Sequence, residues 1–411
     1  MGFGQALSGL NAAATNLDVI GNNIANGSTV GFKSGTAKFA DVYASAAVGL
    51  GTQLAAITQN FGTGTVATTQ NPFDLAIDGT IGFFRVIDPN GAIKYTRNGQ
   101  FLPNSQGFLV NAQGDRLTGY SLDGISLQPI QVPQGNMAPQ ATGGVQTRLN
   151  LDMRATAIPA GVKFDPTNVN SFNNSLPINV YDSLGNSHQM IQYFAKAEAP
   201  ANTWNVYYTL DGEVVGALAD PADPASFVPQ TAQVAFNQNG QIQTVSGAPT
   251  GSYTFGLDIP IPGAANLAFN IDYANSTQYG GDFNYSFSQT GYPTGEYASM
   301  TIEPDGQIVA SYTNGQSAVQ GYLVLANFTN VNGLDSVGGN AWVETGASGQ
   351  PILGRPGTNS LSNVISMAVE ESNVDMSQEL VNLIIAQRTY QANAQTIKTQ
   401  DQILQTLIQM R

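Results

Sequence analysis

The sequence predicts a multidomain α+β protein, in which terminal α-helical coiled-coil segments carry nested β-rich domains of a barrel-like or sandwich-like type. Three observations predict this class. The chain has 411 residues, more than one ordinary hydrophobic core accommodates. Apolar residues at both ends recur every three or four positions, as on one face of a helix. Between the ends, short runs of alternating apolar and polar residues are separated by turn sequences, as expected for strands.

The N-terminal segment is predicted to be a helix over residues 1–26. Its apolar residues are spaced alternately four and three apart, which is the heptad pattern of a coiled-coil seam. These residues are Phe3, Leu7, Leu10, Ala14 and Leu17, and the stripe continues through Ile20 and Ile24.

A longer helix is predicted at the other end, because residues 372–410 contain no Gly or Pro. Asp375 or Ser377 is expected to cap its start. The seam positions, again spaced four and three apart, are Met376, Leu380, Leu383, Gln387, Tyr390, Ala394, Ile397, Asp401, Leu404 and Ile408. Two of them are polar, which costs stability but can fix the register of paired helices. Neither terminal helix has a neighbouring core in the sequence, so we expect each to bury its stripe against the other helix or against another molecule.

Turn sequences between Pro72 and Tyr120 separate short apolar runs. They are "DPNG" (88–91), "RNGQ" (97–100), "NSQG" (104–107) and "AQGD" (112–115), whose Gly, Asn and Asp residues accept the backbone angles of hairpin turns. The same pattern returns from Ser299 to Phe328, with "EPDG" and "TNGQ" as its turns. The region between these two segments has strands of its own, for example in "LPINVYDSLGNSHQMIQYF".

These patterns predict a nested organisation. If the terminal helices pair, the β segments beside them come together, and the middle region becomes a continuous insertion. The expected parts are the helices of an inner core over 1–26 and 364–411, a linker or joint over 27–71, a middle β domain from 72–145 plus 289–360, and an outer β domain over 146–288. A second linker is expected at "GRPGTNSLSN" (354–363).

Charge and composition exclude several classes of partner. The net charge of −14 argues against binding to nucleic acid or to an anionic membrane surface, because both need a footprint of Lys and Arg. Between Arg148 and Ser288 there are 11 acidic and 4 basic residues, which we interpret as a solvated acidic face. Only 10% of the residues are charged, which suits a protein that packs against copies of itself.

The chain has no cysteine, so disulfides, thiolate catalysis and cysteine-ligated metals are excluded. The N-terminal residues lack the basic and continuous apolar regions of a signal peptide. No stretch approaches the roughly 18 apolar residues of a membrane span. If the protein leaves the cell, we expect a route that does not use a cleaved signal peptide.

No catalytic, cofactor or metal site is predicted, and we expect that the protein is not an enzyme. The single histidine, His188, lies beside a turn, where a surface position is far more common than a catalytic base. Asp220 and Asp223 both precede proline, which indicates an exposed loop rather than the shielded pair of a glycosidase. Glu370 and Glu371 are expected to complement the positive end of the C-terminal helix.

The stretch "LDVIGNNIANGSTVGFKSG" (17–35) is rich in glycine, as phosphate-binding loops are. It lacks the G-x-x-x-x-G-K-[ST] pattern, and no buried strand precedes its glycines. Asn and Gly also accept the left-handed backbone conformations that end a helix and redirect the chain. The stretch is therefore interpreted as a joint.

Three long segments resemble the bacterial flagellar axial proteins, the family that builds the rod, the hook and the hook–filament junction. "SGLNAAATNLDVIGNNIANGSTVGFKSG" is similar to their N-terminal signature. "GFFRVIDPNGAIKYTRNGQFLPNSQGFLVNAQGDRLTGY" and "ESNVDMSQELVNLIIAQRTYQANAQTIKTQDQILQTLIQ" are similar to the β segment and C-terminal helix of rod and hook members. The chain length and the large middle region favour the hook branch of the family, while residues 221–295 have no close match.

The resemblance implies a helical homopolymer outside the cell, a curved tube that couples rod to filament as a flexible universal joint. It also implies export by the flagellar type III apparatus, and contacts with distal rod, hook cap and hook–filament junction proteins. The terminal helices would form the inner tube through Leu7, Leu10, Leu17, Ile20, Ile24, Leu380, Leu383, Ile384, Tyr390, Ala394, Ile397, Leu404 and Ile408. The family's joint motif matches Asn22, Asn23, Asn26, Gly31, Phe32 and Lys33.

Two alternatives remain open from the sequence. The nearest is a distal rod or junction protein of the same family. A secreted β-rich carbohydrate-binding or carbohydrate-hydrolysing protein would explain the middle region but neither terminal helix.

Overall fold

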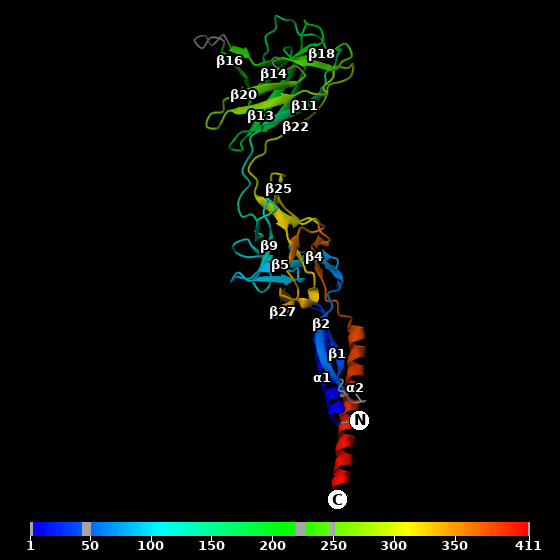
Figure 1. Cartoon of the computed structure of the whole chain (residues 1–411). Helices are drawn as coiled ribbons and strands as arrows, with labels where there is room; N and C mark the ends of the chain where they lie inside the picture. Colours follow the sequence, from blue (N-terminus) through cyan, green and yellow to red (C-terminus); the bar gives the residue numbers. More distant parts are fainter. Residues whose placement is uncertain (1–2, 43–50, 219–226, 247, 249–250, 410–411) are drawn as a thin grey trace. The chain divides into compact units, whose positions relative to one another are not determined.

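The computed structural model describes residues 3–42, 51–218, 227–246, 248 and 251–409, and it divides into two compact units. The first unit comprises residues 1–134, 298–311 and 317–411. The second unit comprises residues 135–297 and 312–316. The described part of the chain is mostly β-sheet, with a long helix near each end (Figure 1).

The two long helices belong to the first unit and are α1 (Phe3–Ala25) and α2 (Met376–Gln409). They run antiparallel, since Gly27 at the end of α1 lies beside Met376, whereas Gly9 lies beside Asn393. Asp375 caps α2, because its Oδ1 accepts hydrogen bonds from the backbone N–H groups of the second and third helical residues at 2.9 and 3.1 Å. The predicted cap at Asp375 is therefore confirmed.

A β-hairpin lies along α1, formed by β1 (Gly35–Val42) and β2 (Gly51–Gln59). α1 contacts both this hairpin and α2, as Figure 1 shows. The segment 27–71, expected to be a linker, thus contains a hairpin packed on the N-terminal helix. The predicted C-terminal helical segment, 364–411, begins as strands, and α2 itself starts only at Met376.

One large sheet forms most of the β structure of the first unit. Its strand order is β23-β24-β25-β9-β5-β6-β28-β27, with β7, β8, β10, β26 and β29 paired along it. Two smaller sheets, β3–β31 and β4–β30, pair strands from opposite ends of the sequence. The bounds are β3 (Val66–Thr68), β4 (Leu75–Asp78), β5 (Phe83–Ile87), β6 (Ile93–Thr96), β7 (Leu102–Pro103), β8 (Leu109–Val110), β9 (Arg116–Tyr120), β10 (Leu127–Pro129), β23 (Tyr297–Ile302), β24 (Gln307–Tyr312), β25 (Ser317–Leu323), β26 (Leu325–Asn327), β27 (Asp335–Gly338), β28 (Ala341–Val343), β29 (Ile352–Gly354), β30 (Asn363–Ser366) and β31 (Ala368–Glu370), and a short 3-10 helix spans Val331–Gly333.

Several hairpin loops share one local structure that the sequence predicts. In each, an Asp or Asn oxygen accepts two backbone N–H groups of the loop, and a glycine three residues later has a positive φ. At Asn104 the two bonds measure 2.9 and 3.0 Å. The loops of this type begin at Asp88, Asn104, Asn111, Asp182 and Asn237. The turns expected at "DPNG" and "NSQG" are confirmed, and the "AQGD" turn starts one residue earlier, at Asn111.

The prediction of a hairpin turn at "RNGQ" (97–100) is wrong. β6 ends at Thr96, and its partners in the sheet are β5 and β28, so residues 97–100 do not connect two paired strands. Gly99 instead allows the backbone of Leu75 to approach closely, because a Cβ at Gly99 would collide with the carbonyl oxygen of Leu75. Residues 354–363 are likewise not a free linker: Arg355 lies 3.5 Å from the ring centroid of Tyr322, and Leu361 is buried.

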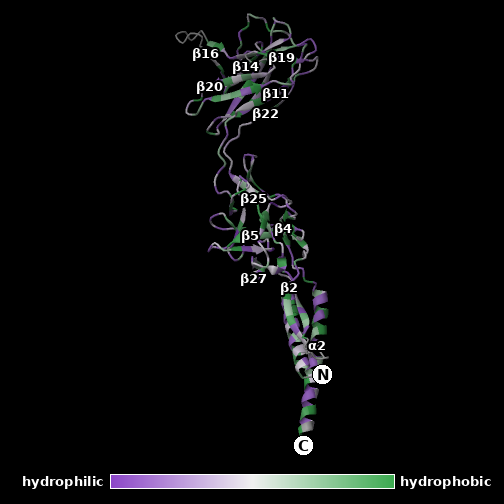
Figure 2. Ribbon diagram, viewed as in Figure 1, coloured by the Kyte–Doolittle hydropathy of each residue, from purple (hydrophilic) through white to green (hydrophobic). Residues whose placement is uncertain are grey.

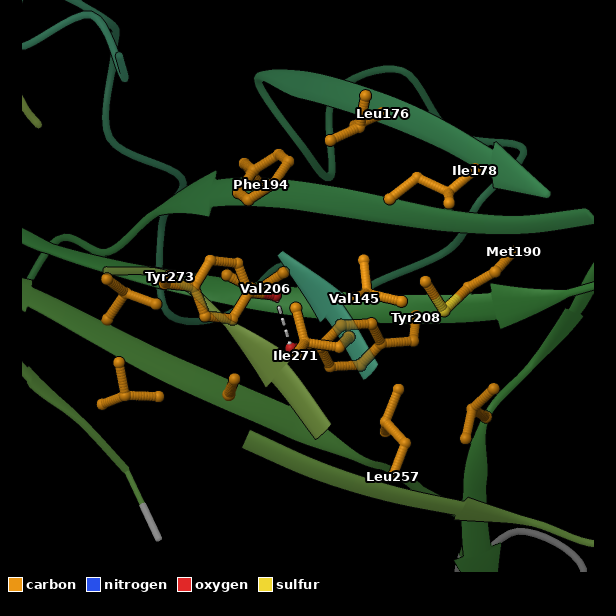
Figure 3. Packing of buried hydrophobic residues seen from close by; sticks show 14 of the residues in the cluster. Val145, Leu176, Ile178, Met190, Phe194, Val206, Tyr208, Leu257, Ile271 and Tyr273 are labelled. Atoms are coloured by element: carbon orange, nitrogen blue, oxygen red, sulfur yellow. Dashed lines mark hydrogen bonds between the residues drawn. The ribbon is translucent and has the colours of Figure 1, made fainter. Parts of the chain in front are cut away.

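The second unit has two principal sheets that share one hydrophobic core (Figure 3). One has the order β20-β21-β11-β22, and the other has the order β12-β13-β14-β18-β19 with β15 beside β14. At the centre of the core, the hydroxyl groups of Tyr208 and Tyr273 hydrogen-bond at 2.8 Å, which satisfies two polar atoms that would be costly to bury alone. The bounds are β11 (Gly144–Asn150), β12 (Asn174–Tyr181), β13 (Ser187–Lys196), β14 (Thr203–Leu210), β15 (Glu213–Val214), β16 (Gly216–Leu218), β17 (Phe227–Pro229), β18 (Thr231–Phe236), β19 (Ile242–Val245), β20 (Thr254–Ile259), β21 (Leu267–Asp272) and β22 (Asn284–Gln289).

Candidate assembly site and joint

The asparagines of the predicted joint fix the end of α1. The side chain of Asn23 is buried and bonds Gly35 in both directions, donating to its carbonyl and accepting from its N–H, each at 2.8 Å. Asn26 donates to the backbone carbonyl and the side-chain oxygen of Asn22, both at 3.0 Å. The Asn23 bonds attach the helix end to the start of β1, whereas the Asn26 bonds stay within the helix end.

Gly31 turns the chain toward the β structure of the first unit. Its φ is +71°, a left-handed conformation that favours glycine. Its N–H donates to the carbonyl of Glu370 at 2.7 Å. A Cβ at this position would lie 2.6 Å from the backbone nitrogen of Asn98, so a larger residue cannot fit without a backbone shift. Phe32, which follows, is half-buried.

Lys33 enters a buried cluster of three charged side chains, which we call the charge cluster: Lys33, Arg97 and Glu370. The Lys33 Nζ lies 2.5 Å from Glu370 Oε1, and the Arg97 Nη1 lies 3.1 Å from Glu370 Oε2. All three side chains have zero exposure to solvent. The backbone N–H of Gly64 also donates to the Glu370 carboxylate, at 2.9 Å. The cluster joins the exit of α1, the end of β6 and the strand that precedes α2.

The cluster contains two cations and one carboxylate, so backbone carbonyl groups supply the remaining negative potential. Lys33 donates to the carbonyl of Gly62 at 2.7 Å, and Arg97 donates to the carbonyls of Gly79 and Thr80. Burial lowers the pKa of the Lys33 ammonium group, and the Glu370 carboxylate opposes this shift. Such a group is tolerated inside a protein only while its partners are present.

Sequence reasoning found Lys33 but missed its two partners. Glu370 was expected to face the positive end of the C-terminal helix, but it belongs to β31 and points to Lys33 instead. Arg97 was read as part of a turn. The sequence offered one weak signal for these partners. Only 10% of the residues are charged, and Lys33 stands in an otherwise neutral, Gly-rich stretch; such an isolated charge, if it is buried, needs a counter-ion.

In the single chain, the buried line of α1 lies one residue away from several predicted seam positions. Ala6, Ala13 and Ile20, spaced seven apart, are buried, whereas Leu7 is exposed. Alanine at two of these positions, Ala6 and Ala13, lets α1 approach its neighbours closely. Of the other predicted seam residues of α1, Phe3 is exposed as well, and the half-buried ones are Leu10, Ala14, Leu17 and Ile24.

α2 buries little of its apolar surface in the single chain. Among its described side chains, Ala386 alone is buried. Three predicted seam residues are half-buried, namely Leu383, Ala394 and Ile397. The other apolar ones are exposed by 39–75%: Met376, Leu380, Ile384, Tyr390, Leu404 and Ile408. The two polar ones, Gln387 and Asp401, are exposed as well. Figure 2 shows hydrophobic and hydrophilic bands following one another along α2.

The exposed apolar side chains of α2 are not restricted to the predicted seam. Val381, Ile385 and Ile403 are each more than half exposed as well. With α1 on one side, α2 thus presents a second apolar surface to solvent. An apolar surface of this extent on an isolated chain marks a contact with another protein.

Four models of flagellar protein families match the chain. By description they are a flagella basal body rod protein (residues 5–33), a flagellar hook protein FlgE/F/G D1 domain (76–147), a flagellar basal body protein FlaE D2 domain (150–292) and a flagellar basal body rod FlgEFG protein C-terminal (365–410). The flagellar hook protein FlgE of Salmonella typhimurium is 45% identical to the chain, with 100% of both chains covered. The chain belongs to the flagellar hook protein family.

Other members of the hook protein family agree with this. The hook protein FlgE of Escherichia coli is 44% identical with 100% of both chains covered, and that of Borreliella burgdorferi is 30% identical over 99% of this chain and 98% of the relative. The protein is a structural subunit of the bacterial flagellar hook. None of these relatives supports the alternative interpretation as a carbohydrate-binding protein. A crystal structure of Helicobacter pylori flagellar hook protein FlgE2, 15% identical, shares the fold with a TM-score of 0.52 over 74% of this chain and 99% of that chain.

The three members of the charge cluster come from three different family segments of this hook subunit. Lys33 is the last residue of the rod-protein segment, Arg97 lies in the D1 segment and Glu370 lies in the C-terminal segment. The cluster is therefore one point at which these segments of the hook subunit are held together.

His188 has a structural environment in the second unit. Its Nδ1 lies 2.7 Å from Asp211 Oδ2, and its Nε2 lies 3.5 Å from Asp182 Oδ2. The hydrogen bond with Asp211 raises the pKa of the imidazole, although partial burial opposes the shift.

The candidate pair Asp220 and Asp223 lies outside the described residues. Neither α1 nor α2 has the length and apolarity that a membrane crossing requires.

We expect His188 to make the stability of the second unit pH-dependent. Because its pKa is higher in the folded chain than the usual 6.5, protonation stabilises the fold below that value, and this contribution is lost as pH rises through the folded pKa. The free energy of unfolding should fall by up to about 1 kcal/mol from pH 6 to pH 8. Urea unfolding in a Trp342→Phe chain, whose remaining tryptophan Trp204 reports the second unit, measures it. His188→Gln should remove the dependence; an unchanged dependence would contradict the assignment.

Proposed function

We propose that this hook subunit assembles through its terminal helices into a curved tube, which acts as a flexible universal joint and transmits torque from rod to filament. The observation that carries the proposal is the exposed apolar surface of α2. Ile384, Ile385, Leu404 and Ile408 are each at least half exposed in the single chain. Neighbouring copies packed side by side as a coiled-coil inner tube would bury these side chains.

The rest of the assembly follows from the family. We propose that the subunit reaches the outside of the cell through the flagellar type III export apparatus, without a cleaved signal peptide. Its neighbours there would be the distal rod, the hook cap and the hook–filament junction proteins. The absence of cysteine is compatible with export of an unfolded chain, since no disulfide has to be reduced or formed.

Torque transmission and bending require different parts of the subunit. The charge cluster and the Asn23 bonds would keep the helices firmly attached to the β structure of the first unit, so that twist applied to the inner tube reaches the outer parts. Bending would occur at polar, weakly charged β surfaces between subunits, which can slide with little loss of buried apolar area. We propose the nested organisation, with the second unit as an insertion in the first, as the basis of this division.

The first experiment is electron microscopy of the purified chain after salting-out. The full chain should form short curved tubes, whereas a chain lacking residues 1–26 and 376–411 should remain monomeric. Straight, rigid tubes would favour a rod protein of the same family.

A single substitution tests the α2 surface without truncation. Ile384→Gln keeps helix propensity and removes an apolar side chain that is half exposed in the single chain. Losing its burial should raise the critical concentration for assembly about tenfold, which corresponds to roughly 1.4 kcal/mol. Sedimentation of polymer measures the critical concentration. Thr399→Gln, at an exposed polar position of the same helix, is the matched control and should assemble normally; equal behaviour of the two variants would argue against this surface.

A further inference from the structure

The second unit has a groove at one end of its two sheets, with both aliphatic and polar side chains in its lining. The groove has a volume of about 460 Å³ and includes Val214, Val215, Ile259, Ile261 and Pro262. It lies where β13 begins, since His188 also lines it. A groove of this size, with aliphatic side chains in its floor and polar ones at its edge, accommodates a small loop that is itself partly aliphatic and partly polar.

The rim of this groove carries unpaired negative charge. Glu213 and Asp258 both line the groove, and both are exposed. Within the described part of the chain, neither forms an ion pair or a side-chain hydrogen bond. The third carboxylate, Asp211, is engaged with His188 at 2.7 Å. The groove therefore fits an aliphatic segment that also carries a positive charge.

A loop with these properties projects elsewhere on the same unit. Residues 158–163, "IPAGVK", form a turn closed by a hydrogen bond from the Val162 N–H to the Pro159 carbonyl at 3.0 Å. Val162 and Lys163 are exposed. Lys163 has no partner among the described residues. We call residues 158–163 the lysine loop.

The lysine loop is held away from the groove of its own chain. The Ile158 N–H donates to the carbonyl of Lys196, the last residue of β13, at 2.8 Å. The groove lies at His188, eight residues earlier on the same strand, which is roughly 26 Å along β13. The residue after the loop, Phe164, stacks on Tyr207 at 4.3 Å, on the face of β14 that points away from the core. This stacking holds the end of the loop on that outer face.

We propose that the lysine loop of one subunit docks into the groove of a second copy, with Lys163 between Glu213 and Asp258. The aliphatic part of the loop would fill the apolar floor of the groove. Because loop and groove are different surfaces at different ends of one unit, the contact is head-to-tail, and such a contact repeats from copy to copy. This inference rests on the proposed function, since it requires a polymer, and it adds a specific contact between second units to the contact through the helices.

Disulfide crosslinking tests the contact directly, because the chain has no cysteine of its own. A full chain with Lys163→Cys and Glu213→Cys should, after assembly and mild oxidation, give a ladder of covalent oligomers on a denaturing gel. Either single substitution should give no ladder. The matched control is Arg148→Cys with Glu213→Cys, because Arg148 is also an exposed cation of the second unit without a partner in the described chain; it should give no ladder.

The outcomes separate the inference from the proposed function. Polymers that form without a ladder, or with an equal ladder in the control, would overturn the inference alone. An unmodified chain that stays monomeric would overturn both.

If the chain with two cysteines does not assemble, reversing the charges of the proposed contact tests the docking instead. Lys163→Glu should raise the critical concentration about two- to fivefold, and adding Glu213→Lys and Asp258→Lys should restore it. A Lys163→Glu chain that assembles like its parent would overturn the docking contact.

Discussion

Replacing Glu370 with alanine is expected to lower the free energy of unfolding of the first unit by about 3–5 kcal/mol. The substitution leaves the ammonium group of Lys33 and the guanidinium group of Arg97 buried without a counter-ion, and it removes the acceptor of the Gly64 N–H. The first two losses are costly, because the side chains of Lys33 and Arg97 have zero exposure and cannot regain hydration. Urea unfolding followed by the fluorescence of Trp342, in a Trp204→Phe chain, measures the effect.

The neighbouring residue provides the control for this prediction. Glu371→Ala changes the same charge at an exposed position and should alter the free energy of unfolding by less than about 0.5 kcal/mol. Lys33→Met should cost less than Glu370→Ala, since Arg97 then keeps the carboxylate to itself. If the two glutamate variants were equally stable, the charge cluster would not be the fastening point between helices and β structure.

Gly31→Ala is expected to destabilise the first unit by about 3 kcal/mol. The left-handed φ of +71° alone costs an alanine roughly 1–2 kcal/mol. The new Cβ would also lie 2.6–2.8 Å from backbone atoms of Arg97 and Asn98, which cannot rotate away as a side chain can. The resulting shift would lengthen the hydrogen bond from the Gly31 N–H to the Glu370 carbonyl and disturb the charge cluster. The same urea titration measures the loss.

A second glycine separates the backbone cost from the steric cost. Gly91 has a φ of +91°, but a Cβ there would meet no atom within 4 Å. Gly91→Ala should therefore cost only about 1 kcal/mol. Equal losses at the two positions would show that the close approach at Gly31 contributes nothing, and that the chain near Asn98 can move aside.

The local features of this fold were readable from the sequence because they depend on neighbouring residues. An Asp or Asn followed three residues later by Gly specifies the same hairpin loop at Asp88 and at Asn104, since all the hydrogen bonds lie within the loop. The helical ends were predicted from the spacing of apolar residues and from the absence of Gly and Pro over 372–410. The family was recognisable for the same reason, because its signatures are continuous segments.

Contacts between distant segments were beyond sequence reasoning. The hairpin formed by β1 and β2 was missed because it packs on α1, a contact that its own sequence does not reveal. "RNGQ" has the composition of a turn, yet its glycine serves the approach of Leu75, a residue 24 positions earlier. A charge alone does not reveal its partner, so Arg97 could not be assigned to Glu370.

The sequence by itself determined the hook family, the two terminal helices and the predominance of strands between them, because each is encoded in local spacing or in a continuous signature. Only the tertiary structure decided how the predicted joint residues are held. The asparagines, Gly31 and Lys33 could equally have formed a loose hinge. They form a rigidly held segment instead, because the buried carboxylate of Glu370, 337 residues after Lys33, lies within hydrogen-bonding distance of the Lys33 ammonium group. A buried ammonium group is stable only beside such a carboxylate.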